Sequence, residues 1–131
     1  MEKIQLIEIP TIKDTRGNLA FIQNGTIPFE CKRVYYLFDV PSSAFRGGHS
    51  HIAQLELLIA LSGSFEVIID DGFEKQVFFL NKPNVGLLIP PGFWRELQNF
   101  SSGSVCLVLN SGEFDEEDYI RNYDEFLSSK K

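Results

Sequence analysis

The chain is divided into short segments rich in β-branched and aromatic residues, and this pattern restricts its fold more than any other feature. Gly, Pro, Asn, Asp or Ser stands at most of the segment ends. Short apolar segments with turn residues at about ten-residue spacing are typical of a β-sandwich or β-barrel. We therefore predict an all-β fold. The segments are residues 4–9, 18–23, 33–40, 55–70, 75–80, 85–90 and 104–110.

The length of 131 residues suits one domain, which we expect to span residues 1–131. Residues 70–72 (Asp-Asp-Gly) lie between two apolar segments and predict a hairpin turn. Residues 61–64 predict a second turn or a bulge.

A short helical tail is expected at the C-terminal end. Tyr119, Tyr123, Phe126 and Leu127 follow the i, i+4, i+7, i+8 spacing of one helix face. Asp115 is a suitable N-cap for this helix. We expect the apolar face of the tail to pack on the sheet.

The charge distribution restricts the possible partners. The net charge is −6, and acidic residues crowd the last twenty positions. A nucleic-acid partner is therefore not expected, since such proteins carry a basic face. An anionic small molecule remains possible, because four arginines outside the tail can converge in three dimensions: Arg16, Arg33, Arg46 and Arg95.

The sequence predicts a cytoplasmic protein without a membrane span. No segment approaches the roughly 18–20 continuous apolar residues that a spanning helix needs. The first ten residues do not have the pattern of a signal peptide. Cys31 and Cys106 lie in apolar strand-like segments and are expected to be buried reduced thiols.

The two histidines of the chain, His49 and His51, are the strongest candidates for chemistry. Residues i and i+2 of a strand point to the same face, so the two imidazoles project side by side if the segment is extended. Gly47 and Gly48 allow a bend just before them. Imidazoles titrate near neutral pH, and proton transfer is the chemistry that such a pair does best.

A metal site is the alternative for this pair. The spacing of His49, His51 and Glu56 resembles the first motif of the cupin superfamily, whose fold is a double-stranded β-helix or jelly roll. Residues 86–99 resemble the second motif, but Arg95 stands where metal-binding cupins have histidine. A guanidinium is not a normal metal ligand. Glu56 follows His51 by an odd offset, which predicts that it faces the opposite side of a regular strand. We therefore predict no metal, with a three-residue iron site as the alternative.

Several segments, in order along nearly the whole chain, resemble the thymidine-diphosphate 4-keto-6-deoxyhexose 3,4-ketoisomerases (WxcM-like sugar ketoisomerases), which are small cupins. The family usually has Lys after the second His, then an acidic residue and Gln, where this chain has Ile52, Leu55 and Glu56. The matching segments are residues 14–19 (DTRGNL), 27–29 (IPF), 32–39 (KRVYYLFD), 46–51 (RGGHSH), 68–72 (IIDDG), 100–102 (FSS) and 115–123 (DEEDYIRNY).

The resemblance implies an isomerase that moves the ketone of a dTDP-linked 4-keto-6-deoxy sugar from C4 to C3. It also implies no cofactor, and a homodimer that can exchange N-terminal strands. We expect His49 to be the carbon base, His51 to orient it or carry protons between the oxygens, and Tyr35 to donate to the enolate or relay a proton.

The predicted substrate-binding residues are mainly arginines. Arg33 shares a strand face with Tyr35 and is expected in the polar interior. Arg16 and Arg46 are candidates for the diphosphate, because guanidinium matches phosphate oxygens. Arg95 is expected to contact the ligand, and Trp94 is a candidate to stack on the thymine ring.

Other classes of function remain open at this point. A non-catalytic nucleotide-sugar-binding cupin, a metal-dependent cupin dioxygenase and a sugar epimerase share parts of the same pattern. Tight binding without turnover, metal content and product stereochemistry distinguish them.

Overall fold

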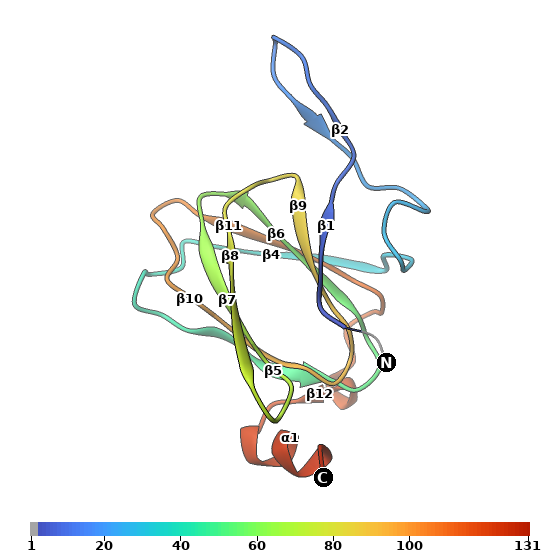
Figure 1. Cartoon of the computed structure of the whole chain (residues 1–131), viewed down its shortest axis with the longest axis vertical. Coiled ribbons are helices and arrows are strands. Elements are labelled where there is room, and N and C mark those ends of the chain that lie inside the picture. Colours follow the sequence, from blue (N-terminus) through green and yellow to red (C-terminus); the bar gives the residue numbers. More distant parts are fainter. Residues whose placement is uncertain (1–2) are drawn as a thin grey trace.

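Two five-stranded antiparallel sheets face each other in the computed structural model, which describes residues 3–131 (Figure 1). This confirms the all-β prediction and matches the two-sheet arrangement of a jelly roll. The strands are β1 (Gln5–Glu8), β2 (Thr11–Ile12), β3 (Leu19–Ala20), β4 (Arg33–Phe38), β5 (Arg46–His51), β6 (Glu56–Ser62), β7 (Phe65–Asp70), β8 (Lys75–Leu80), β9 (Val85–Ile89), β10 (Trp94–Gln98), β11 (Val105–Asn110) and β12 (Tyr119–Ile120).

The first sheet has the strand order β1-β9-β6-β11-β4, and its central strand β6 is covered on both faces. Leu58 of β6 faces the second sheet, while Leu57 and Ile59 face outward. Ile9 and Ile27 from the N-terminal segment pack on that outward face. A strand buried on both sides is apolar at nearly every position, which explains why residues 55–61 do not alternate between apolar and polar side chains.

The second sheet has the strand order β12-β5-β10-β7-β8. Strands β7 and β8 form the predicted hairpin, and Asp71 Oδ1 accepts hydrogen bonds from the backbone N–H groups of Phe73 and Glu74 in its turn. The turn at residues 63–64 leads from β6 in the first sheet to β7 in the second. Gly63 there has a φ of +68°, which favours glycine.

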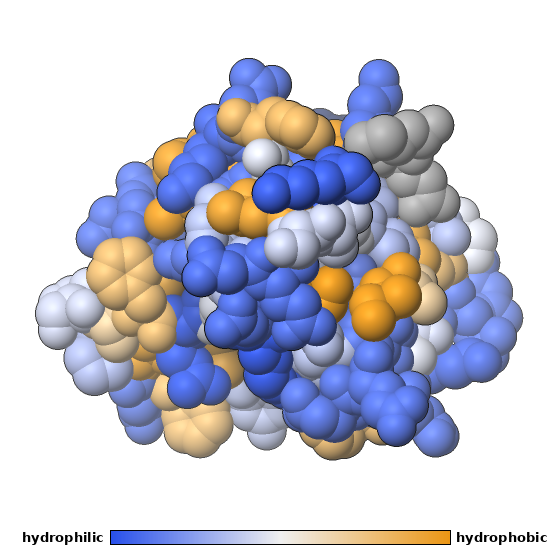
Figure 2. Space-filling view, turned by 90° about the horizontal axis from the view of Figure 1, so that it is seen from below, coloured by the Kyte–Doolittle hydropathy of each residue, from blue (hydrophilic) through white to orange (hydrophobic). Residues whose placement is uncertain are grey.

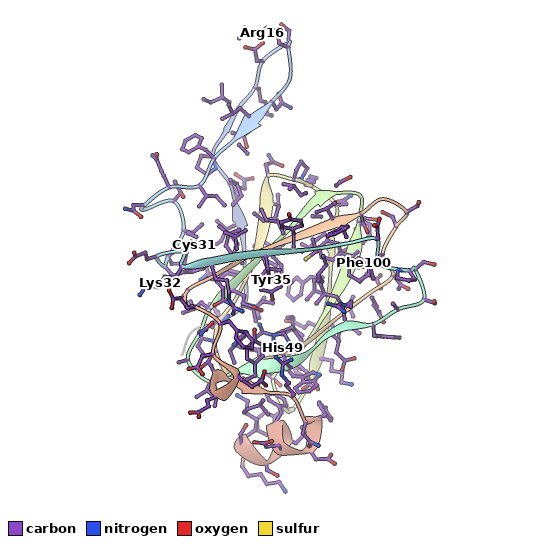
Figure 3. All side chains as sticks on the ribbon, turned by 180° about the vertical axis from the view of Figure 1, so that it is seen from behind. Arg16, Cys31, Lys32, Tyr35, His49 and Phe100 are labelled. Carbon is purple, nitrogen blue, oxygen red and sulfur yellow. The ribbon has the colours of Figure 1, made fainter. Side chains whose placement is uncertain are left out.

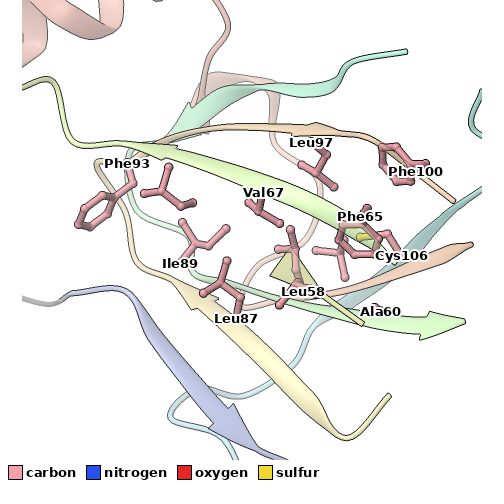
Figure 4. Close-up of a cluster of buried hydrophobic side chains, with 13 residues drawn as sticks. Leu58, Ala60, Phe65, Val67, Leu87, Ile89, Phe93, Leu97, Phe100 and Cys106 are labelled. Atoms are coloured by element: carbon pink, nitrogen blue, oxygen red, sulfur yellow. The ribbon is translucent and has the colours of Figure 1, made fainter. Parts of the chain in front are cut away.

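The space between the sheets holds the main hydrophobic core (Figure 4). Both sheets contribute to it, with Phe65 and Val67 of β7 fully buried. The ring of Phe65 stacks on Phe100 with centroids 5.2 Å apart. Cys106 lies in this core as a free thiol, as predicted, whereas Cys31 is half-buried at the outer face of the first sheet.

A small hairpin of β2 and β3 projects from one end of the molecule (Figure 1). Strand β1 pairs with β9, and the chain then leaves the sheet for this hairpin. Ile12 and Leu19 of the hairpin are exposed to solvent.

The C-terminal tail is helical only at its end, so the predicted helix face is wrong at Tyr119. A 3₁₀ turn, η1 (Glu116–Asp118), leads into β12, where Tyr119 pairs with His51 of β5. The helix α1 (Tyr123–Ser129) begins later, because Asn122 Oδ1 accepts the N–H of Glu125 and forms its N-cap. Asp115 caps the 3₁₀ turn instead.

Hydrophilic residues cover most of the end of the molecule that carries α1, with hydrophobic residues in smaller groups (Figure 2). No helix among residues 3–131 is long and apolar enough to cross a membrane.

The packing of α1 on the second sheet gives a stability prediction. Phe126 is fully buried, and its ring lies 5.7 Å from that of Trp94. Phe126→Ala is expected to lower the free energy of unfolding by about 3–5 kcal/mol, measured by urea denaturation. The control Phe73→Ala, at a position 83% exposed, should change it by less than about 0.5 kcal/mol. Equal effects of the two variants would contradict the packing of α1.

Candidate active site

A cavity of about 450 Å³ lies between the two sheets and is open to solvent. Strands β4, β5, β6, β10 and β11 form its wall, and the segment after β11 contributes Phe114, Tyr119 and Arg121. Four guanidinium groups line it, together with Tyr35, His49 and Glu56. A concave site with several cations favours an anionic ligand. The four arginines are Arg33, Arg46, Arg95 and Arg121.

Glu56, the first residue of β6, lies at the inner end of this cavity and is 1% exposed. Its Oε1 accepts from Nη1 of Arg95. Its Oε2 accepts from the hydroxyl of Tyr35 at 2.7 Å and from Nδ2 of Asn110 at 2.9 Å. One carboxylate therefore joins β4, β6, β10 and β11 in the interior.

The inward position of Glu56 corrects the sequence prediction, which placed it on the opposite face from the histidines. Strand β5 ends at His51, and β6 begins at Glu56 in the other sheet. The turn at residues 52–55 separates the two strands, so the alternation of faces does not continue from one to the other.

The ionisation of Glu56 and Tyr35 is coupled. Burial alone would raise the pKa of Glu56, but the Arg95 guanidinium holds it well below its usual value. Burial, followed by the charge of Glu56, raises the pKa of the Tyr35 hydroxyl above its usual range. Tyr35 is therefore neutral and donates its proton to an ionised Glu56.

The two imidazoles lie on the same side of β5, as predicted from their spacing, with ring centroids 4.9 Å apart. Gly47 adopts a φ of +77° where the pairing of β5 with β10 shifts register, and this bulge precedes His49. The ring of Tyr119 contacts both imidazoles, at centroid distances of 5.0 Å and 4.5 Å. Figure 3 shows His49 and Tyr35 inside the sandwich.

Asp118 positions His51. Its Oδ2 lies 2.9 Å from His51 Nδ1, and its two carboxylate oxygens also accept the backbone N–H groups of Ala53 and Gln54. A carboxylate at Nδ1 favours the tautomer that carries hydrogen on that nitrogen. His51 Nε2, which then carries the lone pair, lies 3.3 Å from Glu56 Oε2.

His49 lines the cavity, and its Nε2 is 3.8 Å from Glu56 Oε1. Burial lowers the pKa of His49 to about 4, and the contact with Glu56 offsets only part of that effect. His49 is therefore a neutral imidazole at pH 7, which is the form that can accept a proton.

His49, His51 and Glu56 are also the residues that could hold a metal ion, since one ligand atom of each lies within 4.8 Å of the others. The fit is poor, because Glu56 already balances the charge of Arg95, and a divalent cation would lie next to that guanidinium. These three residues therefore suit a divalent metal ion poorly.

Five of the predicted site residues line the cavity: Tyr35, His49, Arg33, Arg46 and Arg95. His51 is fully buried behind them and contacts Glu56.

The structure places two of the predicted binding residues outside the cavity. Trp94 is 5% exposed, packs on Tyr123 and Phe126, and does not line the cavity. Its side chain points toward α1 because neighbouring strand residues alternate sides, and Arg95 takes the inward position. Arg16 lies at the tip of the β2–β3 hairpin with its side chain 88% exposed, bonded to Asp14 (Figure 3). The hairpin carries Arg16 away from the cavity of its own chain.

Sequence reasoning missed Asp118 and Arg121 and gave Tyr119 only a packing role. These residues belong to the segment 115–123, whose apolar spacing indicated a helix. The match of that segment to the ketoisomerase pattern was the signal that pointed to the site.

The fold and site together define a cupin-type protein whose interior combines acid–base groups with cations for an anionic ligand. The family model FdtA (WxcM-like, C-terminal) matches residues 2–131. A TDP-4-oxo-6-deoxy-α-D-glucose-3,4-oxoisomerase of Aneurinibacillus thermoaerophilus is 46% identical over 123 residues, covering 93% of this chain and 88% of that protein. The chain therefore belongs to the FdtA family.

Solved structures agree with this assignment. A mutant of the 3,4-ketoisomerase QdtA from Thermoanaerobacterium thermosaccharolyticum, in complex with TDP-4-keto-6-deoxyglucose, matches with a TM-score of 0.96 and 40% identity over 99% of this chain and 95% of that chain. The TDP-quinovose 3,4-ketoisomerase WlaRB from Campylobacter jejuni matches with a TM-score of 0.91 and 43% identity over 98% of this chain and 99% of that chain.

The buried pair of Glu56 and Arg95 gives a prediction about stability. Arg95→Met leaves a buried carboxylate without its cation and should lower the free energy of unfolding by about 3–5 kcal/mol. Glu56→Leu combined with Arg95→Met removes both charges and should be more stable than Arg95→Met alone. Urea denaturation of both single variants and the double variant measures the coupling. Additive losses would contradict an energetically coupled pair.

Proposed function

We propose that this protein is a sugar-nucleotide 3,4-ketoisomerase that converts a dTDP-linked 4-keto-6-deoxyhexose into its 3-keto isomer. The observation that carries the proposal is a neutral, buried His49 in a cavity lined by four guanidinium groups. Family membership supports the reaction class, and the relatives named above act on TDP-linked sugars or bind one.

The reaction moves two hydrogens and needs no external oxidant. A base removes the proton from C3, and the C4 ketone becomes an enediolate. The hydroxyl proton of O3 is transferred to O4, and a proton is returned to C4, which leaves the ketone at C3. The protein must supply a base that is neutral at working pH, donors for the enediolate charge and a route for the hydroxyl proton.

The residues of the cavity suit these tasks. We assign the carbon base, and the acid that protonates C4, to His49. Arg95 faces the same space and supplies positive charge near the enediolate, and Tyr35 offers a route for the hydroxyl proton. Arg33, Arg46 and Arg121 supply cations for the diphosphate.

We also propose that the protein works as a homodimer in the cytoplasm. Leu6, Ile12 and Leu19 of the N-terminal segment are exposed, and they are apolar surface that a second copy would cover. The β2–β3 hairpin would carry Arg16 toward that copy. Both cysteines are free thiols, which suits a reducing compartment.

Incubation with the dTDP-linked 4-keto-6-deoxy sugar in deuterated water tests the function. We expect a 3-keto isomer that carries deuterium, detected by NMR. Substitution His49→Asn should reduce turnover by about 10²–10⁴-fold, since it removes the base. Tight binding of the sugar nucleotide, with neither isomer nor incorporated deuterium, would contradict the enzymatic function and support a non-catalytic binding protein. Full turnover by His49→Asn would contradict the assigned base.

The pH dependence follows from the lowered pKa of His49, whose active form is the neutral one. Because its pKa is about 4, kcat/KM should stay constant as the pH falls from 8 to about 5.5. A base with an ordinary histidine pKa would give about a tenfold decrease over that range. Circular dichroism at each pH controls for unfolding. A half-maximal rate near pH 6.5 would contradict a desolvated His49.

A further inference from the structure

Glu56 lies at the centre of the acid–base groups of the site and contacts both histidines and Tyr35. It lines the cavity beside Tyr35 and His49, and it also meets His51 behind them. Its carboxylate is ionised at rest, because it accepts from Arg95 and Asn110 inside the protein. An ionised carboxylate with a neutral hydroxyl donor on one side can receive a proton.

Tyr35 connects the cavity to this carboxylate. Its hydroxyl hydrogen is committed to Glu56 Oε2 at 2.7 Å, so the lone pairs of its oxygen are left to accept. A sugar hydroxyl in the cavity can therefore donate to Tyr35, while Tyr35 donates to Glu56. This alignment forms a continuous hydrogen-bonded path from a substrate oxygen to a buried carboxylate.

His51 stands at the other end of the path. With hydrogen on Nδ1 directed at Asp118, its Nε2 carries the lone pair and lies 3.3 Å from Glu56 Oε2. Two acceptors then face each other, and His51 Nε2 has no hydrogen-bond partner within the described part of the chain.

We propose that Glu56 temporarily holds the hydroxyl proton that moves from O3 to O4 during the isomerisation. This inference rests on the proposed function. The O3–H bond breaks as Tyr35 accepts that proton and passes its own to Glu56 Oε2. The proton then returns through Tyr35 and forms the O4–H bond. His49 separately carries the proton from C3 to C4, so no oxidant or reductant is required.

The path of the hydroxyl proton through Glu56 is separate from the transfer of the carbon proton by His49, and this predicts a specific defect in Glu56→Gln. A carboxamide cannot accept the hydroxyl proton. In deuterated water, the variant should still remove the C3 proton through His49, but the enediolate should return to substrate more often. The ratio of C3 deuterium in recovered substrate to isomer formed should rise about tenfold or more over the wild type. NMR and mass spectrometry of the same reaction measure both quantities.

Tyr35→Phe is the second variant and should raise the same ratio, because it interrupts the path before Glu56. The Tyr35→Phe variant tests the relay on its own if Glu56→Gln does not fold. The matched control is Asp70→Asn, which alters a buried carboxylate that accepts from Tyr123 at 2.5 Å outside the cavity. This control should keep the wild-type ratio.

The results separate the relay from the function. If the folded variants lose exchange and isomer formation in equal proportion, Glu56 and Tyr35 have only a structural role and the relay is wrong. A wild-type protein that forms neither isomer nor deuterated substrate overturns the proposed function and the relay together. A wild-type protein that isomerises, with variants that keep its ratio, overturns the relay alone.

Discussion

The ion pair between Glu56 and Arg95 is the contact on which the interior of this protein depends. A carboxylate that is 1% exposed stays charged only if a cation and several donors surround it. Arg95, Tyr35 and Asn110 provide them from three other strands. The pair thereby fixes the spacing of both sheets around the cavity and determines which groups there are charged and which are neutral.

The fold brings these groups together because the site lies where strands of both sheets and the C-terminal segment meet. Strand β5 presents His49 and His51 from the second sheet, and β6 presents Glu56 from the first. Asp118 in the 3₁₀ turn and Tyr119 in β12 close the site from behind the histidines. Residues that are distant in the sequence thus form one acid–base network, and burial within it keeps His49 neutral.

Local patterns in the sequence predicted the features that depend on neighbouring residues. Strand alternation placed Arg33 with Tyr35, and His49 with His51, on shared faces, and both placements are confirmed. Features that depend on turns were not predictable in this way. Because a turn follows His51, Glu56 faces the opposite side from the one expected. Tyr119 belongs to β12, which pairs with β5, and not to the expected helix.

The residues whose positions depend on tertiary structure were the hardest to predict. Trp94 and Arg95 are neighbours in β10, and sequence alone does not say which of them faces the cavity. Arg16 lies in a turn, as expected, but the direction of the projecting hairpin is a property of the whole fold. The resemblance to a family identified the chemistry correctly at the level of the family, while the network around Glu56 emerged only from the structure.

The charge state of Glu56 tests this account most directly. Carboxyl ¹³C NMR of protein labelled at glutamate, with the signal assigned by its absence in Glu56→Gln, reports ionisation at that one position. Because burial is outweighed by Arg95, we predict that the Glu56 signal keeps its ionised chemical shift from pH 8 down to about pH 4, below the ordinary glutamate pKa. A signal that titrates near or above the ordinary glutamate pKa would contradict an ionised Glu56 held by Arg95.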